Sequence, residues 1–230
     1  MTASLPAAVL WDMDGTLVDS EPYWIAAETP LVHRFGGRWS HEDALSVVGL
    51  GLHDAARVLQ EAGVAMAADD IVQTLTSDVL AQLARTGVPF RPGARGMLRA
   101  LRGRGVPTAL VTMSLRRMAD AIVELLGFDA FDVVIAGDEV DRPKPDPDPY
   151  LRACLRLGVD PRDTVAIEDS PNGVRAALSA GATTIGVPLL VPLHETGAHE
   201  LWVSLEGRSP ADLAAVHARR GAAEALRAAR

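Results

Sequence analysis

The sequence has little cysteine and few aromatic residues. A single cysteine, Cys154, stands among 230 residues, which excludes an internal disulfide and a zinc site built from cysteines. We interpret it as a small core residue on a helix. The apolar segment around Val9 and Leu10 runs directly into Asp12 and Asp14, so it is too short for a signal peptide or a membrane span. We therefore expect a cytoplasmic protein with no membrane partner.

Positive charge is also scarce. The chain carries 22 basic and 30 acidic residues, a net charge of −8. This balance argues against a nucleic-acid or anionic-membrane binder, because a phosphate backbone requires a positive surface. The arginines near the end lie in an alanine-rich helical pattern, which we interpret as a solvated helix face: Arg219, Arg220, Arg227 and Arg230. An anionic substrate would have to be held by local groups.

Short apolar runs alternate with helical patterns, which predicts an α/β fold. Five runs are predicted to be buried strands, at residues 7–11, 108–111, 133–136, 164–167 and 183–187. Helical patterns follow the later strands, for example at 115–126 and 171–180. The repeated order of strand and helix predicts a doubly wound parallel sheet with helices on both faces. Such sheets bind ligands beyond the carboxyl ends of their strands.

One interval interrupts this alternation. Helical patterns at 22–35, 53–62 and 69–85 follow the first strand without a convincing strand between them. We predict an α/β core domain of residues 1–19 and 91–230, with residues 20–90 forming a helical cap inserted after the first strand. The cap is expected to lie above the strand ends, where a lid would stand. A purely structural helical subdomain is the alternative.

The first strand ends in Asp12-Met13-Asp14-Gly15. Two carboxylates separated by one residue, followed by a glycine that permits a sharp turn, are suited to a cation site beside a nucleophile. An ordinary Asp- and Gly-rich turn is the alternative interpretation, since both residues favour turns.

Three further strand ends carry polar residues. Thr112 follows the second strand, and Lys144 stands between prolines after the third; Glu168 and Asp169 follow the fourth. Singly, each has an ordinary explanation as a helix cap or a solvated side chain. Because the carboxyl ends of parallel strands meet at one crevice, the four ends together supply the acids, cation ligands and phosphate-binding donors that phosphoryl transfer requires.

Three segments resemble the motifs of a known family. They are Asp12–Glu21, Lys144-Pro145 with Pro147-Asp148, and Glu168–Gly173. With them, the stretch from about residue 7 to 190 resembles the haloacid dehalogenase superfamily, in the helical-cap branch that contains small-molecule phosphatases and β-phosphoglucomutase. The resemblance implies a magnesium-dependent enzyme that forms an aspartyl-phosphate.

The resemblance also implies roles for individual residues. Asp12 would attack phosphorus, and Asp14 would be the general acid and base. Phosphate binding would fall to Thr112, Met113 and Lys144, although Met113 stands where many relatives place a small polar residue. Mg²⁺ would be held by Asp12, the Asp14 carbonyl and Asp169, with Glu168, Ser170 and Asn172 supporting the site.

Candidate substrate contacts in the cap are Glu21, Trp24, Leu50 and His53. Core packing is the alternative for the aromatic residues of the cap. Leu50 sits where phosphomutase-like relatives carry a basic residue for a second phosphate, which favours a phosphatase over a mutase. His194 and His199 are five residues apart around a glycine, which does not fit the zinc-protease spacing, so that segment is predicted to be a loop.

The function that these features predict is hydrolysis of a small phosphate monoester with Mg²⁺ as cofactor. A sugar phosphomutase of the same family is the alternative. A non-catalytic receiver-like signalling module also uses Asp, Thr and Lys around magnesium, but it lacks a helical insertion and has no use for Asp14. We expect a small phosphorylated metabolite as partner and a monomer or weak homodimer. The sequence does not name the substrate.

Overall fold

The chain folds around one six-stranded parallel sheet in a computed structural model that describes residues 3–228. Across the sheet the strands are β3 (Val133–Ile135), β2 (Thr108–Val111), β1 (Ala8–Trp11), β4 (Thr164–Glu168), β5 (Thr183–Gly186) and β6 (Glu200–Leu201). The prediction of a doubly wound parallel sheet is confirmed, and each of the five expected strands agrees with the structure to within one residue at either end.

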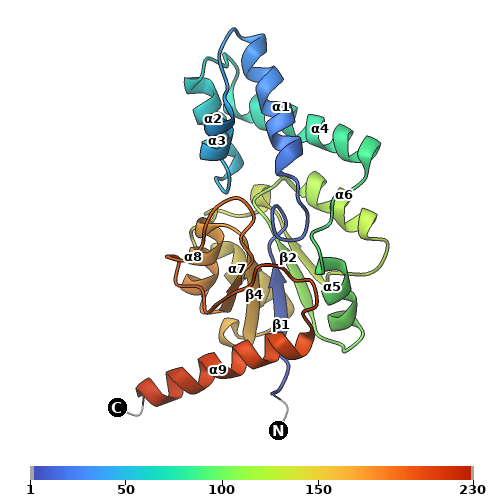
Figure 1. Cartoon of the computed structure of the whole chain (residues 1–230), viewed down its shortest axis with the longest axis vertical. Coiled ribbons are helices and arrows are strands. Elements are labelled where there is room, and N and C mark those ends of the chain that lie inside the picture. Colours follow the sequence, from blue (N-terminus) through green and yellow to red (C-terminus); the bar gives the residue numbers. More distant parts are fainter. Residues whose placement is uncertain (1–2, 229–230) are drawn as a thin grey trace.

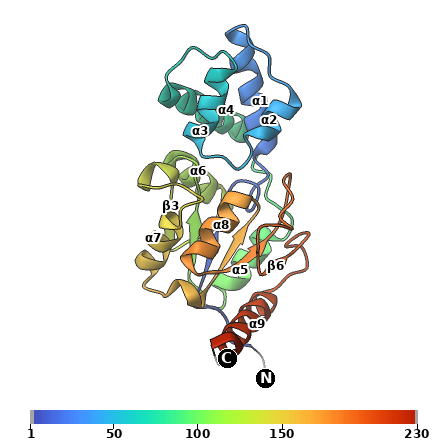
Figure 2. The ribbon, with the colours of Figure 1, turned by 90° about the vertical axis from the view of Figure 1, so that its left-hand side faces the viewer.

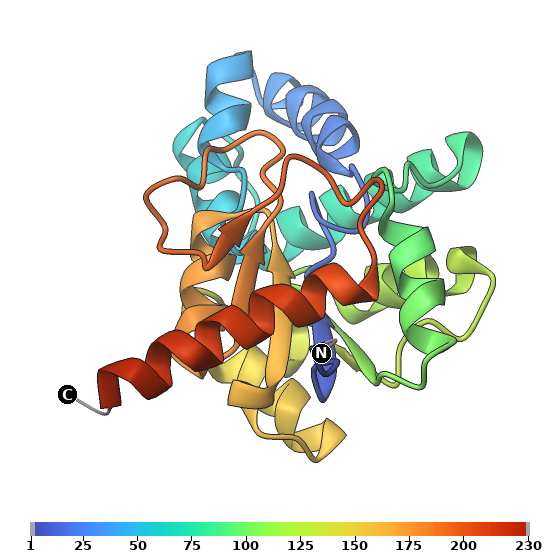
Figure 3. The ribbon, with the colours of Figure 1, turned by 60° about the horizontal axis from the view of Figure 1, so that its bottom comes forward.

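Helices cover both faces of the sheet (Figures 1 and 3). One face carries α5 (Ala94–Arg102), α6 (Arg116–Leu126) and α9 (Pro210–Ala228), and the other carries α7 (Asp148–Leu157) and α8 (Pro171–Ala180). Alternation along β1 produces the two layers: Val9 and Trp11 join one apolar cluster, while Leu10 joins the cluster that holds Cys154. Short 3₁₀ turns at Gly137–Glu139 and Pro161–Asp163 complete the connections.

The predicted helical insertion after the first strand is confirmed. It consists of four helices between β1 and α5, one more than expected: α1 (Glu21–Arg34), α2 (His41–Ser46), α3 (Leu52–Glu61) and α4 (Ala68–Thr86). Figures 1 and 2 show them as a separate layer beyond the carboxyl ends of the strands. Two neighbouring segments join this helical cap to the sheet, and they hydrogen-bond to each other through Asp19 N to Pro89 O (2.8 Å) and Arg91 N to Leu17 O (2.9 Å).

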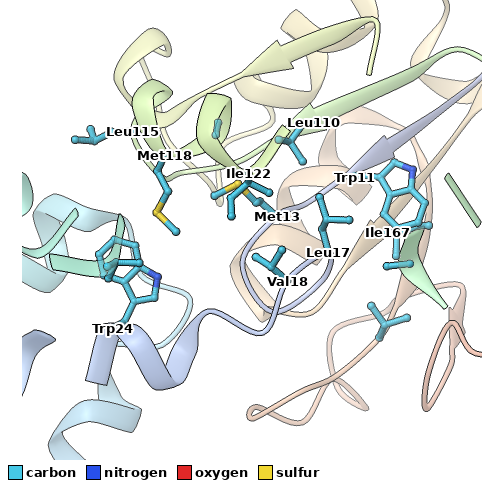
Figure 4. Packing of buried hydrophobic residues seen from close by; sticks show 14 of the residues in the cluster. Trp11, Met13, Leu17, Val18, Trp24, Leu110, Leu115, Met118, Ile122 and Ile167 are labelled. Atoms are coloured by element: carbon cyan, nitrogen blue, oxygen red, sulfur yellow. The ribbon is translucent and has the colours of Figure 1, made fainter. Parts of the chain in front are cut away.

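The cap and the sheet share one continuous apolar cluster. Figure 4 shows part of it, from Trp11 and Ile167 of the sheet through Met13 and Leu17 to Trp24 of α1. Polar contacts add to this packing: Arg117 of α6 donates to Gln73 O (2.8 Å) on α4. The cap therefore lies over the strand ends with its apolar face turned toward them.

The C-terminal part adds β6 to one edge of the sheet, beside β5, and α9 to the face that α5 and α6 also cover. The segment from His194 to His199 is a loop, as predicted, and Arg219 of α9 pairs with Glu200 (2.9 Å). Arg230, which the sequence placed on the solvated helix face, lies outside the described residues. Between residues 3 and 228 no helix has both the length and the apolarity that crossing a membrane requires.

Candidate active site

Lys144 and Asp12 form the centre of the site. The Lys144 Nζ lies 2.7 Å from Asp12 Oδ1, 2.7 Å from Glu168 Oε1 and 2.8 Å from the carbonyl oxygen of Val111. Burial lowers the pKa of Lys144, but the charges of Asp12 and Glu168 outweigh it and hold that pKa above its usual value. The lysine is therefore a permanent, fixed cation at the strand ends.

Asp12 is buried, and only one of its two carboxylate oxygens is held. Its Oδ2 has no hydrogen-bond partner among the described residues. Burial and the neighbouring charge of Glu168 raise the pKa of Asp12 to about 7, against the opposing effect of Lys144. A buried carboxylate oxygen without a donor is energetically costly, and such an oxygen is available for a ligand or a reaction.

Three carboxylates meet at this point. Oxygen atoms of Asp12, Glu168 and Asp169 all lie within 4.8 Å of one another. Burial, followed by the charges of Asp12 and Glu168, raises the pKa of Asp169 well above its ordinary value. Since Glu168 Oε2 also lacks a donor, the group fits a divalent cation with oxygen ligands, such as Mg²⁺, which would offset the repulsion.

Two glycines make this close arrangement of acids possible. Gly15 has φ of +80°, and a Cβ there would lie 1.9 Å from Asp169 Oδ2. A Cβ at Gly173, in the first turn of α8, would lie 2.0 Å from the Glu168 carboxylate. Side chains at these two positions would displace Asp169 and Glu168, which explains the glycines of both sequence motifs.

Tyr150 belongs to the site, although no motif in the sequence marks it. Its hydroxyl donates to Glu168 Oε1, and its ring lies 5.1 Å from the Lys144 Nζ. Tyr150 is completely buried on α7. It therefore fixes Glu168, and through Glu168 the lysine, from the side of the sheet that faces α7.

The carboxylate of Asp14 lies within reach of four donors. Ser20 Oγ (2.5 Å) and Trp24 Nε1 (3.4 Å) donate to Oδ1, while Ser114 Oγ (2.7 Å) and Thr112 Oγ1 (3.3 Å) donate to Oδ2. Ser114 was not among the predicted site residues, although it follows Thr112 by two positions. Because Trp24 belongs to the cap, the position of Asp14 depends on both layers of the molecule.

The remaining predicted residues around the strand ends have distinct contacts. The sulfur of Met113 accepts from the backbone N–H of Lys144 (3.3 Å). Ser170 caps α8 by accepting from Gly173 N (3.1 Å), and it lines the pocket. Asn172 instead donates to the carbonyl of Gly49 in the cap (3.1 Å), so its side chain links the two layers.

A pocket lies between the strand ends and the cap. Asp12, Asp14, Thr112, Lys144 and Asp169 line it from the sheet side. From the cap, three of the candidate substrate contacts, Glu21, Trp24 and Leu50, line it, together with Glu28, which the sequence interpretation missed. His53 lies elsewhere: it borders a second hollow, its side chain is 57% exposed, and it pairs with Asp69 (2.8 Å).

Both cap glutamates are in surroundings that disfavour a charge. Burial is the main cause in each case, and it raises the pKa of Glu28 to about 7 even though Trp39 Nε1 donates to Glu28 Oε2 (3.1 Å). For Glu21, burial and the charges of Asp14 and Glu28 raise the pKa to about 8. Two acids of this kind are unusual in a pocket wall that is otherwise apolar on the cap side.

Glu28→Gln is expected to stabilise the protein at high pH. Below pH 4.5 Glu28 is neutral in the folded and unfolded chains and contributes no pH dependence. Between pH 4.5 and about 7 the unfolded chain releases the proton first, so the free energy of unfolding falls as pH rises. Above pH 7 the full penalty applies, up to about 3 kcal/mol. Glutamine avoids it and can still accept from Trp39.

Thermal or urea unfolding of both proteins at pH 5 and pH 8 measures this effect. We expect a more stable variant at pH 8 and a much smaller difference at pH 5. Glu61→Gln, at an exposed position of α3, is the matched control and should follow the original protein at both values. Equal stability of Glu28→Gln and the original protein at pH 8 would show that Glu28 is ionised without cost.

A six-stranded parallel sheet, a helical insertion after β1 and buried acids around a fixed lysine define a capped hydrolase that acts on phosphate esters. The chain belongs to the haloacid dehalogenase-like hydrolase family, in its helical-cap branch, and it is a phosphatase of that family. The family model matches residues 6–181.

Individual relatives agree with this assignment. Hexitol phosphatase A of Escherichia coli is 33% identical, over 77% of this chain and 81% of the relative. The bifunctional riboflavin kinase/FMN phosphatase of Arabidopsis thaliana is 32% identical over 81% of this chain, which spans about half (49%) of that longer protein. Among solved structures, CbbY from Rhodobacter sphaeroides in complex with xylulose-(1,5)bisphosphate has a TM-score of 0.82 at 30% identity, covering 91% of this chain and 99% of that one.

Proposed function

We propose that the chain is a Mg²⁺-dependent phosphatase that hydrolyses small phosphate monoesters through an aspartyl-phosphate on Asp12. The observation that carries this proposal is the unpartnered Oδ2 of Asp12, in a pocket wall and on a carboxylate whose other oxygen is held by Lys144. That arrangement leaves one carboxylate oxygen without a hydrogen bond on a residue of the pocket wall. It also places a fixed cation where the charge of the phosphoryl group must be neutralised.

In the first half-reaction, Asp12 Oδ2 forms a bond to phosphorus, and the bond from phosphorus to the ester oxygen breaks. Asp14, which lines the same pocket, gives a proton to the departing oxygen. In the second half-reaction a water molecule attacks phosphorus, Asp14 accepts its proton, and Asp12 departs as a carboxylate. Thr112, Met113 and Lys144 are proposed to bind the phosphoryl oxygens.

The proposed Mg²⁺ ligands are Asp12, the Asp14 carbonyl and Asp169. The residues proposed to support these ligands are Glu168, Ser170 and Asn172. When bound, the ion supplies positive charge for the phosphoryl oxygens.

The cap, residues 20–90, is proposed to move relative to the core, because only two segments join it to the sheet. Closing it would exclude water from the site. A small phosphorylated metabolite is the proposed partner, and a monomer or weak homodimer the proposed assembly.

A chelator is expected to abolish the activity. Phosphate release from a panel of phosphate monoesters should stop in excess EDTA and return with excess Mg²⁺, because three buried carboxylates around one lysine leave a surplus of negative charge. Asp169→Asn should raise the Mg²⁺ concentration needed for half-maximal rate by at least about tenfold, with the fold intact.

Asp129→Asn is the control for this experiment, since Asp129 is exposed and precedes β3, at the amino end of that strand rather than at the carboxyl ends where the site lies. It should require the same Mg²⁺ concentration as the original protein. Undiminished hydrolysis in excess EDTA, or an unchanged Mg²⁺ requirement in Asp169→Asn, would contradict the proposed metal site.

A further inference from the structure

The inner face of α1 carries an acidic stripe into the pocket. Glu21, Trp24 and Glu28 are spaced by three and four residues, so they lie along one face of the helix, and all three line the pocket. Glu28 is 5% exposed. Trp39 donates to its Oε2, but no described group donates to its Oε1. In the described part of the chain the Glu21 carboxylate has no hydrogen bond or ion pair.

The other described cap residues that line the pocket carry no charged side chain. This part of the wall is apolar, formed by Val47, Val48, Leu50, Leu52, Ala55, Val72 and Leu75 with Gly49. Among the described residues that line the pocket, Lys144 is the only lysine or arginine, and its Nζ is already shared by Asp12, Glu168 and the Val111 carbonyl. A second anionic group on the substrate would therefore meet carboxylates and aliphatic carbon.

The described residues around the neighbouring hollow offer no free cation for such a group either. Its two basic side chains are each held by a carboxylate: His53 pairs with Asp69 (2.8 Å), and Arg57 pairs with Asp54. An anion placed there would have to displace an existing partner. The charge distribution of both hollows thus opposes a substrate with two acidic groups.

We propose that the cap side of this pocket selects uncharged, hydroxyl-bearing leaving groups, such as those of sugar and alditol monophosphates, through Glu21 and Glu28, and rejects a second phosphate or a carboxylate. This inference rests on the proposed phosphatase function. A hydroxyl donates a hydrogen bond to a carboxyl oxygen whether that carboxyl is ionised or neutral. Above about pH 8 both glutamates are ionised, and a carboxylate or a phosphate dianion on the substrate then has no hydrogen to donate to them and adds like charge at short range.

Matched substrate pairs test this selectivity directly. Fructose 6-phosphate and fructose 1,6-bisphosphate differ by one phosphate, while glycerol 3-phosphate and 3-phosphoglycerate differ by the exchange of a hydroxymethyl for a carboxylate. For the original protein with Mg²⁺ at pH 9, where both glutamates are ionised, we expect kcat/KM to be at least about tenfold higher for the less anionic member of each pair. Equal values, or a preference for the more anionic member, would overturn the inference.

Two variants test whether the glutamates cause this selectivity. Glu28→Gln and Glu21→Gln replace a carboxylate with an amide that can donate to an anion, so each should reduce the preference within a pair by about tenfold. Glu61→Gln should leave the preference unchanged. Should one variant fail to fold in a melting experiment, the other gives the same measurement. An unaltered preference in a folded variant would overturn the role of that glutamate.

The selectivity and the phosphatase activity can fail separately in these experiments. Hydrolysis of all four esters with a preference for the anionic members would overturn the selectivity while leaving the phosphatase proposal intact. Failure to hydrolyse any phosphate monoester in the presence of Mg²⁺ would overturn both.

Discussion

Asp12→Asn is expected to lower kcat/KM for every phosphate monoester by at least about 10⁴-fold, the scale of loss when a nucleophile is removed. An amide cannot attack phosphorus, and the unpartnered Oδ2 of Asp12 is the proposed attacking atom. The fold should survive the change. Burial raises the pKa of Asp12 to about 7 despite Lys144, so a neutral side chain of the same shape suits the position, and Lys144 retains Glu168 as a partner.

Steady-state kinetics together with a melting curve measure both parts of this expectation. Asp129→Asn makes the same chemical exchange at an exposed position and should retain full activity. An Asp12→Asn protein that is folded and loses less than about tenfold in kcat/KM would show that another group attacks phosphorus, since a loss that small lies below the range of even a general acid–base contribution.

Asp14→Asn is expected to slow both half-reactions, with a dependence on the leaving group. An alkoxide needs a proton in order to depart, so alkyl phosphates should lose about 10²- to 10⁴-fold. A nitrophenolate is a weak base and departs without a proton, so with an aryl phosphate the first step is largely spared. Attack by water remains impaired in both cases. The variant should therefore release a burst of phenolate close to one equivalent and accumulate phosphoenzyme.

Rapid-mixing experiments with an aryl and an alkyl phosphate distinguish these cases. The burst should occur with the aryl ester alone. Ser114→Ala is a useful comparison, because it removes one donor to Asp14 while keeping the carboxylate, and it should lower the rate without a burst. An equal loss for both esters, with no burst, would make Asp14 a structural or metal-site residue.

Much of the fold follows from patterns within short stretches of sequence. The five predicted strands are apolar runs buried in the sheet, and α8 occupies residues 171–180 as expected. Among the elements that were not predicted, two are very short. The helix α2 has six residues and is stabilised by the capping box of Ser40 and Asp43, while β6 has two residues. Both are too short for periodicity to show, and their positions depend on tertiary contacts.

The site was predictable where a motif marks it. Asp12, Asp14, Lys144 and Asp169 all meet in one pocket. Tyr150 and Glu28 gave no such signal, because each belongs to a helix, α7 and α1, and reaches the site only through the packing of that helix. His53 shows the converse: its position in the cap suggested a substrate contact, but the direction of its side chain on α3 places it against Asp69.

Trapping the aspartyl-phosphate shows most directly whether Asp12 is the residue that takes up the phosphoryl group. Asp14→Asn mixed with an aryl phosphate and Mg²⁺, quenched in acid during the burst and digested, can be analysed by peptide mass spectrometry. We expect one phosphoryl group per chain, on Asp12, and none in Asp12→Asn treated in the same way. A phenolate burst with no label on the protein, or with the label on a different residue, would contradict the proposed role of Asp12.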